Sequence, residues 1–402
     1  MGNEIELASV ITDIAAGPFG SNLKVECFVP YGFPIIDGAN LKGYKVTDNL
    51  TKFVTEEKAR FLSRSIARRG DVVVTISGTL GQIAYIPEDS MFEEYLCSQR
   101  QFRVSFDTSQ VYVPYLVFYF HTFEGQNKIL SFANQTGVPA LSQPLKNFKK
   151  IRLCLPDYPT QKKIASIIEA FNDKIECNQK INDNLEQQAT AYFQELFVAN
   201  ANPNWKIGTI SDLGTVTGGS TPSKAKPEYY TDNGIAWITP KDLSMNKSKF
   251  ISHGETDITE LGLKNSSASI MPEGTVLFSS RAPIGYIAIS SGEVTTNQGF
   301  KSVVPKSEIG AAFVYFFLKH NLPTIEGAAS GSTFKEVSGS TMKNIPAIVP
   351  DASTLEKFND FCSTLFEKQK TLEQENQHLA FLRDTLLPKL MSGEIDVSSI
   401  QL

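Results

Sequence analysis

The sequence predicts an α+β protein, built as a tandem duplication of a β-rich domain that is followed in each copy by a long helix. Three observations support this prediction. A coiled-coil seam runs through residues 164–196, the same seam recurs 194 positions later, and short β-rich segments recur in the same order in front of each seam. The predicted segments are two β-rich domains at 1–155 and 204–349, with helices at 156–198 and 350–392.

The first seam has the period of 3.5 residues that is typical of a coiled-coil helix. Alternate steps of four and three give Ile164, Ile168, Phe171, Ile175, Asn178, Asn182, Leu185, Ala189, Tyr192 and Leu196, of which eight of ten are apolar. The same count in the second half gives Phe358, Cys362, Leu365, Gln369, Leu372, Asn376, Leu379, Arg383, Leu386 and Leu390. The residues between the seam positions are mainly charged or amide side chains, so each helix has one face to bury.

The β-rich character of the first copy comes from short apolar runs that end at Gly, Pro and Asp turns. The predicted strands are Phe33–Asp37, Asp71–Ile76, Gln82–Ile86 and Lys150–Leu155. Between them, Pro114 is placed to start a buried helix over 113–120, because proline fits the first turn of a helix. A polar linker at 199–203 separates the first helix from the second copy.

The second copy repeats the framework of the first, with an offset that drifts between 194 and 204 as loop insertions would cause. The matched pairs are Ile11–Ile14 with Ile210–Leu213, Gly17–Ser21 with Gly218–Pro222, Phe33–Leu41 with Ile235–Leu243, Gly70–Thr75 with Gly274–Ser279, Gly81–Ala84 with Gly285–Ala288, Ser98–Phe102 with Asn297–Phe300, and Thr136–Val138 with Ser330–Ser332. Framework residues recur and loop residues differ. This pattern predicts two related but unequal ligands.

Charge and cysteine content fit a cytoplasmic protein with neutral globular parts. The net charge is −5, but residues 1–150 hold 15 basic and 15 acidic side chains, and residues 204–345 hold 13 and 12, so the acidity belongs to the helices and their flanks. The five cysteines are widely spaced and form no Cys-x-x-Cys pair, which argues against a zinc site or a disulfide framework. No apolar run of eighteen residues and no signal-like start are found, so we expect no membrane segment.

Enzyme motifs are missing from the sequence. It holds no glycine-rich nucleotide loop and no Asn/Asp-Pro-Pro-aromatic motif of amino-methyltransferases. Its four histidines are isolated from one another in the sequence. Asp351 with Glu356 and Lys357 resembles a nuclease signature only faintly, and an Asp at a helix start is an ordinary capping residue. We therefore expect a protein that is not a catalyst and binds neither metal nor cofactor.

The combination of features resembles the specificity (S) subunit of type I restriction-modification systems. The resemblance is carried by the closing segment Leu386–Asp396, by the helix start at 156–164, by the glycine loop Gly218–Pro222, and by the duplicated arrangement itself. It covers nearly the whole chain. Leu355 stands where the first copy has Gln161, and Pro18 interrupts the first glycine loop, which makes the transfer of individual DNA contacts unsafe.

The resemblance implies that each β-rich part is a target recognition domain that reads one half of a bipartite, asymmetric site in double-stranded DNA. It implies further that the two helices pair as an antiparallel coiled coil. Two methyltransferase subunits, which carry S-adenosylmethionine, and restriction subunits with motor and nuclease activity are the implied partners. The alternative is a non-catalytic coiled-coil scaffold that binds protein partners rather than DNA.

Helix length independently supports a spacing role. A helix over 160–197 is about 57 Å long at ~1.5 Å per residue. A strut of this length could separate two DNA-reading domains by roughly ten to fifteen base pairs, about one turn. Asn182 and Asn376 occupy equivalent seam positions, and a buried polar residue there would hold the register of the pair. The alternative is that the helices only dimerise or brace the domains.

Candidate DNA contacts lie in loops that carry Lys, Arg, amide or hydroxyl groups, which bind phosphates and base edges. They are Ser21, Lys24, Ser77, Thr79, Gln99, Arg100, Thr221, Lys224, Lys226, Lys241, Arg281, Asn297 and Gln298. Arg281 is the strongest candidate because it replaces Ser77 at the matching turn and can hold a guanine with two bonds. A separate set is expected to form either a methyltransferase-binding patch or aromatic core: Phe193, Phe197, Phe361, Phe366 and Phe381.

Overall fold

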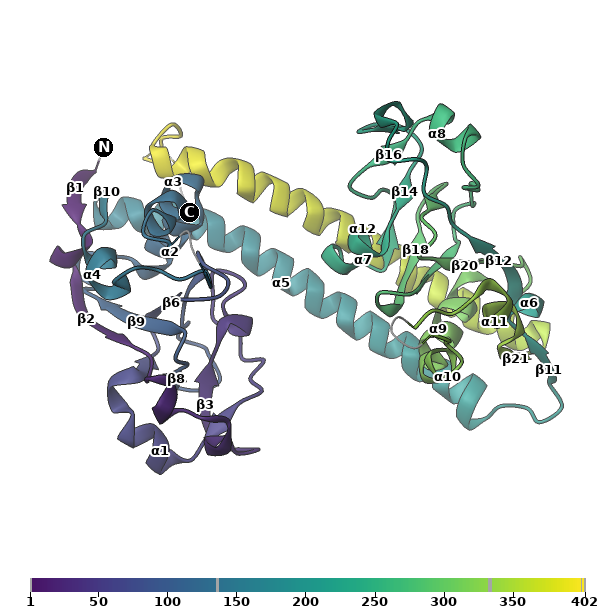
Figure 1. Ribbon diagram of the computed structural model, residues 1–402, viewed down its shortest axis with the longest axis horizontal. Coiled ribbons are helices and arrows are strands. Elements are labelled where there is room, and N and C mark those ends of the chain that lie inside the picture. Colours follow the sequence, from purple (N-terminus) through teal and green to yellow (C-terminus); the bar gives the residue numbers. More distant parts are fainter. Residues whose placement is uncertain (1, 135–136, 332–334, 399, 401–402) are drawn as a thin grey trace. The chain divides into compact units, whose positions relative to one another are not determined.

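The computed structural model describes residues 2–134, 137–331, 335–398 and 400. Its contacts divide the chain into two units, Met1–Lys174 with Leu379–Leu402 and Ile175–His378. Each unit contains one globular part and half of each of two long helices, α5 (Tyr158–Gln194) and α12 (Ala352–Ser392) (Figure 1). Thr136 and Ser332, which belong to the last matched pair of the sequence repeat, lie outside the described residues.

The first unit contains two four-stranded sheets and one terminal strand pair. The first sheet has the order β2 (Ile11–Ala16), β9 (Gln101–Phe106), β6 (Val72–Thr75), β7 (Ile83–Tyr85). The second has the order β4 (Phe53–Val54), β3 (Phe33–Ile36), β8 (Glu94–Cys97), β5 (Ile66–Arg68), and β3 runs parallel to β8. The pair is β1 (Asn3–Glu6) with β10 (Arg152–Leu155).

Short helices pack against both sheets of this unit, the first of them against the second sheet and the other three against the first. They are α1 (Glu56–Phe61), α2 (Val113–His121), α3 (Phe123–Leu130) and α4 (Pro144–Lys149), with 3₁₀ turns at Leu7–Ser9, Gly20–Asn22, Val25–Cys27, Gly38–Asn40 and Ser63–Ser65. Pro114 stands in the first turn of α2, as the sequence predicts. Phe102 of β9, Phe120 of α2 and Phe148 of α4 meet in the core at ring distances of 5.2 and 5.6 Å.

The second unit contains one larger sheet and three strand pairs. The sheet has the order β12 (Gly214–Gly218), β20 (Lys301–Pro305), β17 (Val276–Ser280), β18 (Ile284–Ser290), β15 (Phe250–Ile251). The pairs are β11 (Lys206–Thr209) with β21 (Pro346–Val349), β13 (Tyr230–Thr231) with β16 (Asp257–Ile258), and β14 (Trp237–Ile238) with β19 (Thr295–Thr296). The helices are α6 (Ile210–Leu213), α7 (Pro240–Met245), α8 (Glu260–Lys264), α9 (Ala311–His320), α10 (Leu322–Gly327), α11 (Gly339–Asn344) and the 3₁₀ turn Pro227–Tyr229.

The two units share one topology, which confirms the predicted tandem duplication. The order β2–β9–β6–β7 recurs as β12–β20–β17–β18. The parallel pair β3 and β8 recurs as the parallel pair β14 and β19. In both units a terminal antiparallel pair, β1 with β10 and β11 with β21, closes the domain beside the start of its long helix.

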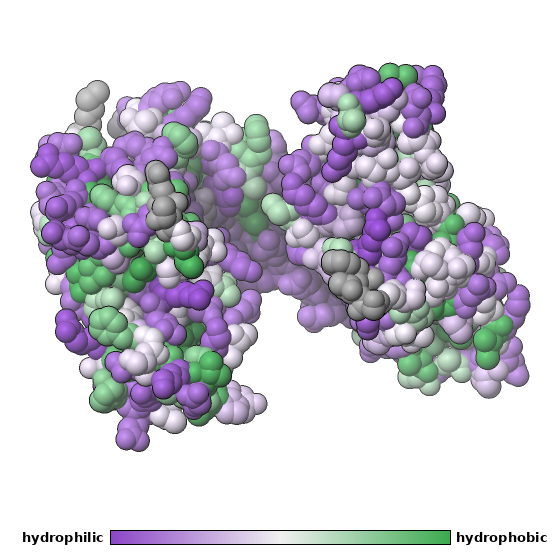
Figure 2. Space-filling view, viewed as in Figure 1, coloured by the Kyte–Doolittle hydropathy of each residue, from purple (hydrophilic) through white to green (hydrophobic). Residues whose placement is uncertain are grey.

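The long helices pair antiparallel within each unit, as the resemblance implies. In the first unit Ile164 and Ile168 pack with Leu387 and Leu390. In the second unit Asn178 of α5 bonds to Asn376 of α12, and Tyr192, further along α5, lies 5.9 Å from Phe358, which comes earlier in α12. The two helices therefore run in opposite directions. Every predicted seam position is buried or half-buried. The helix surface that is visible in Figure 2 is mainly hydrophilic.

The helix ends differ slightly from the prediction. Helix α5 begins at Tyr158 and is followed by a π-helical turn at Glu195–Ala199, where the sequence predicts regular helix. Asp351 is a helix-capping residue. Its carboxylate accepts bonds from the Ser353 hydroxyl, the Trp205 indole and the Thr354 amide, which together lower its pKa. This arrangement supports the interpretation of Asp351 as a cap over the faint nuclease signature.

The buried polar layer of the coiled coil differs from the expected one. Asn376 accepts a bond from Asn178 at 2.9 Å, whereas the backbone carbonyl of Asn182 accepts a bond from Gln369 at 3.1 Å. Asn182 and Asn376 are equivalent in sequence, but antiparallel pairing places each opposite a different residue of the other helix. The Asn178 Oδ1 atom is buried and has no hydrogen-bond partner in the described part of the chain.

Replacing both Asn178 and Asn376 with leucine is expected to raise the unfolding free energy or leave it unchanged, with a gain of up to about 1–3 kcal/mol. The reason is that the change removes a buried acceptor without a partner and fills a coiled-coil seam with apolar side chains. Urea unfolding followed by circular dichroism measures the effect. A double variant that is clearly less stable than wild type would show that the polar layer makes a net contribution to stability.

The proposed aromatic patch is mostly core. Phe193 and Phe197 are buried in the main core of the second unit, and Phe366 packs against it. Phe361 is half-exposed, and Phe381 is 66% exposed. Of the two alternatives, the aromatic core therefore holds for Phe193 and Phe197, because α9 of the globular part covers that side of the helices.

No helix within residues 2–134, 137–331, 335–398 and 400 is long and apolar enough to cross a membrane.

Candidate nucleic-acid interface

Each unit carries one polar cleft, and both clefts are built from the same loops. In the first unit a cleft of about 800 Å³ lies between the loop after β2, the β6–β7 turn and the β8–β9 turn. In the second unit a cleft of about 760 Å³ lies between the loop after β12, the β17–β18 turn and the β19–β20 turn. The duplicated fold thus produces two sites of similar size at equivalent places.

Eleven of the thirteen predicted contact residues line one of these clefts. Five line the first cleft: Lys24, Ser77, Thr79, Gln99 and Arg100. Six line the second: Thr221, Lys224, Lys241, Arg281, Asn297 and Gln298. Ser21 is exposed on the 3₁₀ turn Gly20–Asn22, outside the lining of the first cleft. Lys226 lies outside the lining of the second, where its ammonium group stacks 5.3 Å from the Tyr229 ring.

The floor of the first cleft is a network of amide side chains. The Gln82 amide donates to the Gly38 carbonyl at 2.9 Å, and its oxygen accepts a bond from the Thr75 hydroxyl at 3.0 Å. Gln101 is 1% exposed, and its side-chain oxygen accepts a bond from the Ser98 hydroxyl. These bonds hold the floor of the cleft rigid beneath the exposed loop residues.

The sequence analysis missed an ion pair in the first cleft. Lys52 reaches Asp37 at 2.6 Å, and both residues line the cleft. Burial alone would raise the pKa of Asp37, but Lys52 and the Ala39 amide outweigh it and lower the pKa. Lys52 precedes the two-residue strand β4, which has no counterpart among the matched repeats, so the repeat pattern contained no signal for it.

The second cleft combines aromatic walls with paired charges. The Trp237 indole donates to the Ser220 carbonyl at 3.0 Å, and the Tyr230 ring lies 5.7 Å from the Trp237 ring. Lys241 pairs with Glu255 at 2.5 Å. The Thr221 hydroxyl donates to Gln298, which links the first and third loops of this cleft. Tyr230, Trp237 and Glu255 are lining residues that the sequence analysis did not single out.

Strand register defines which loop residues correspond. Thr75 pairs with Gln101, and Ser279 bridges Phe300, so Phe300 corresponds to Gln101 rather than to Phe102. This alignment corrects the sequence match by one residue and places Gly299 at the position of Arg100. The other turn shows the reverse exchange, because Arg281 takes the position of Ser77.

Each cleft therefore contains an arginine, supplied from a different loop. In the first cleft Arg100 comes from the β8–β9 turn, and it is exposed. In the second cleft Arg281 comes from the β17–β18 turn and pairs with Glu336 at 3.3 Å. Glu336 also pairs with Lys301 at 3.5 Å, so this carboxylate steadies both cations.

The chemistry of both clefts suits a polar, anionic partner with hydrogen-bonding edges. Lysine and arginine bind phosphates, and arginine or amide side chains form bidentate bonds with the base edges of the major groove. Two of the acids in the linings, Asp37 and Glu255, are each paired with a lysine. Asp242 of the second cleft accepts bonds from Thr239 and from the Glu255 amide, and Glu26 adds a further carboxylate to the first cleft. The framework is the same in both units while the side chains that point into the clefts differ.

A chain of two units, each with a polar cleft built from equivalent loops and lined by different side chains, has the arrangement expected of a protein that binds two unlike sites. The sequence profile of the type I restriction modification DNA specificity domain matches residues 26–187 and 202–380, one match in each copy. The chain belongs to this family.

Relatives with similar sequences are specificity subunits of type I restriction enzymes. The MjaIX specificity subunit of Methanocaldococcus jannaschii is 38% identical over 191 residues, which span 45% of this chain and 44% of that subunit. The HindI specificity subunit of Haemophilus influenzae is 28% identical over 320 residues, covering 61% of this chain and 69% of that subunit. The chain thus spans less than half of the length of the first of these relatives.

A solved structure shares the fold over nearly the full length. The crystal structure of the type I restriction-modification system S subunit from M. genitalium superposes with a TM-score of 0.62 and covers 96% of this chain and 95% of its own. Its sequence identity is 16%, so the likeness concerns the fold alone.

Proposed function

We propose that this chain is the sequence-specific DNA-recognition subunit of a type I restriction-modification system and that it reads a bipartite, asymmetric site in double-stranded DNA. Each cleft binds one half-site. The observation that supports this function best is the pair of clefts that share one framework but differ in their side chains. Arg100 of the first cleft corresponds to Gly299 of the second, and Ser77 corresponds to Arg281.

The subunit itself is non-catalytic and acts in the cytoplasm through partners. Two methyltransferase subunits supply S-adenosylmethionine and the methyl transfer, and restriction subunits supply motor and nuclease activity. This chain itself binds no cofactor. Family membership and the lack of a nucleotide loop or methyltransferase motif in the sequence support this division of labour.

The paired helices set the distance between the two half-sites. Helix α5 has 37 residues, so it is about 56 Å long at ~1.5 Å per residue. At ~3.4 Å per base pair, that length corresponds to about sixteen base pairs, roughly one and a half turns of DNA.

A genome-wide map of adenine methylation tests this function. Cells that express the chain with its neighbouring methyltransferase are compared with cells that express the methyltransferase alone. A new two-part motif with a fixed central gap is the expected result. A stable complex without a new motif would contradict sequence-specific recognition, and failure to form the complex would favour a scaffold that binds other proteins.

DNA binding by the complex is expected to weaken steeply with salt, because cationic side chains release counterions from the phosphates. Lys24→Ala, at the rim of the first cleft, should weaken binding to all sequences alike and reduce the slope of log affinity against log salt by about 1. Fluorescence anisotropy over a salt series measures this slope. The scaffold alternative predicts no salt-sensitive duplex binding. Lys146→Ala serves as the matched control, because Lys146 is exposed on α4 of the same unit and lies outside the cleft lining.

A further inference from the structure

One backbone position in each globular part lies against the long helices and has a different side chain in the two units. The Tyr85 amide donates to the Tyr44 carbonyl at 3.0 Å, and the Ile289 amide donates to the Lys249 carbonyl at 2.7 Å. Tyr85 and Ile289 are equivalent, since they pair with Val72 and Val276 at the same register. Tyr44 and Lys249 are therefore structural counterparts.

Lys249 reaches between the two helices of the second unit. Its side chain is 5% exposed. The ammonium group forms an ion pair with Glu186 of α5 and donates to the side-chain oxygen of Gln369 of α12 at 2.6 Å. It also lies 4.1 Å from the Phe366 ring of α12, a cation–π contact inside a desolvated site.

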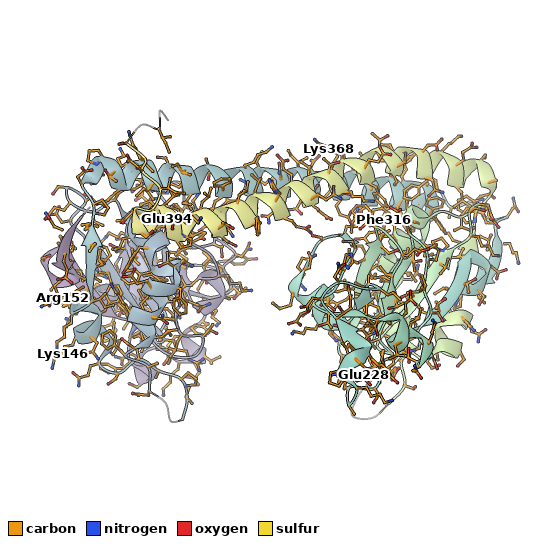
Figure 3. All side chains as sticks on the ribbon, turned by 90° about the horizontal axis from the view of Figure 1, so that it is seen from above. Lys146, Arg152, Glu228, Phe316, Lys368 and Glu394 are labelled. Atoms are coloured by element: carbon orange, nitrogen blue, oxygen red, sulfur yellow. The ribbon has the colours of Figure 1, made fainter. Side chains whose placement is uncertain are left out.

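Further groups complete this contact. The Glu373 carboxylate of α12 accepts bonds from the backbone amides of Lys249 at 2.8 Å and Phe250 at 3.1 Å. Glu186 also pairs with Lys319 of α9 at 2.6 Å. Phe316 of α9 lies 5.4 Å below the Lys249 ammonium, and Figure 3 places it where the globular part meets the helices.

The charges in this site balance each other. Burial lowers the pKa of Lys249, and Glu186 acts against that shift. Burial would raise the pKa of Glu186, but Lys249 and Lys319 outweigh it and lower the pKa. A buried ion pair of this kind contributes little net stability compared with apolar packing, so it is better suited to holding one geometry.

The first unit contains the same contact with the roles of cation and ring exchanged. The ring of Tyr44 lies 5.6 Å from the guanidinium of Arg383, a seam residue of α12. Arg383 donates to the side-chain oxygen of Asn172 of α5 at 2.9 Å, so it touches both helices. Phe118, the counterpart of Phe316, packs edge-on against Tyr44 at 4.8 Å.

Both contacts lie on the segment that also lines the cleft. In the second unit Thr239–Asp242 lines the cleft, and Lys249 follows seven residues after Asp242. In the first unit Asp37 and Gly38 line the cleft, and Tyr44 follows six residues after Gly38. A short, ordered connection thus links each cleft to its helices.

We propose that Lys249 with Phe366 and Glu186, and Tyr44 with Arg383, are cation–π joints that hold each cleft at one orientation on the helix pair. In this role Lys249 and Tyr44 are positioning residues that restrict the gap allowed between half-sites. The inference rests on the proposed function. Directional bonds to both helices resist rotation of the cleft, which uniform apolar packing does less well.

Methylation mapping of joint variants tests this proposal. Lys249→Met keeps the length of the side chain and removes the charge. Arg383→Met removes the guanidinium group and its bond to Asn172 in the first unit, keeps an unbranched apolar side chain, and leaves Tyr44 in place. Lys247→Met is the matched control, because Lys247 lies two residues away and stacks on Tyr286 of its own globular part at 4.6 Å. Each variant is expressed with the methyltransferase, and the methylated motif is read from the genome.

Both joint variants are expected to keep the two half-site sequences and to methylate sites whose gap is one base pair longer or shorter, at least tenfold above the wild-type level at those sites. Lys247→Met should show the wild-type gap. A uniform fall in methylation with an unchanged gap would overturn the proposal and leave the joints with a purely stabilising role. If Lys249→Met fails to accumulate, Arg383→Met decides by the same criterion. A wild-type map without a two-part motif would instead refute the proposed function.

Discussion

Arg281→Ala is expected to relax or abolish recognition of one half-site while the other half-site and the gap stay unchanged. The guanidinium of Arg281 is one of the side chains that line the second cleft, and Glu336 holds it there at 3.3 Å. Loss of a bidentate contact with a base costs about 1–3 kcal/mol of discrimination. That is roughly a 5- to 150-fold loss of preference for the correct base. A methylation map of the variant measures the preference at each position of the motif.

Arg100→Ala is the natural counterpart of this experiment. It should affect the half-site read by the first cleft, because Arg100 lines that cleft. Equal loss at both half-sites in the Arg281 variant would argue against a local base contact and would indicate a defect in folding or assembly. Thermal melting of both variants separates these explanations, since a half-exposed arginine contributes little to stability.

Phe358→Ala is expected to destabilise the second unit by about 3–5 kcal/mol. Phe358 of α12 is completely buried, and its ring lies 5.2 Å from Phe197, 5.8 Å from Phe193 and 6.0 Å from Phe316. Truncation removes the ring at which both helices and α9 meet. Because single domains are stable by only about 5–15 kcal/mol, the variant should unfold at much lower urea concentrations.

Phe361→Ala is the matched control for the core truncation. Phe361 lies three residues further along the same helix, is 39% exposed and contacts Tyr192 at 4.8 Å. We expect it to cost much less than Phe358→Ala, because half of its ring is already in water. Similar losses for both variants would contradict the assignment of Phe358 to the centre of the core.

Periodicity was a sufficient guide to the helices and to the duplication. The seam from Ile164 to Leu196 and its copy from Phe358 to Leu390 are buried or half-buried at every position, because a coiled coil requires a regular apolar stripe. The strands Phe33–Ile36, Val72–Thr75 and Ile83–Tyr85 were predicted from short apolar runs between turns. Two-residue strands such as β4 were not predicted, because two residues are too few to show an alternating pattern.

The sequence led to cleft-lining residues where loop residues stood beside a repeated framework. Lys24, Arg100 and Arg281 were found because their neighbours recur in both halves, and they line the clefts. Lys52 and Tyr230 were missed because long-range strand pairing brings them to the clefts from segments without a matched repeat. Whether these residues contact DNA remains the prediction that the variants above test.

The sequence by itself determined the duplicated α+β plan, the two coiled-coil helices and the family, because apolar periods and repeated turns are written locally along the chain. Tertiary structure alone decided which side chains meet. It paired Asn178 with Asn376, buried Phe193 and Phe197, and placed Lys249 between two helices. The physical reason is that hydrogen bonds and ring contacts depend on distances of a few ångströms between residues far apart in sequence, and only the folded packing defines those distances.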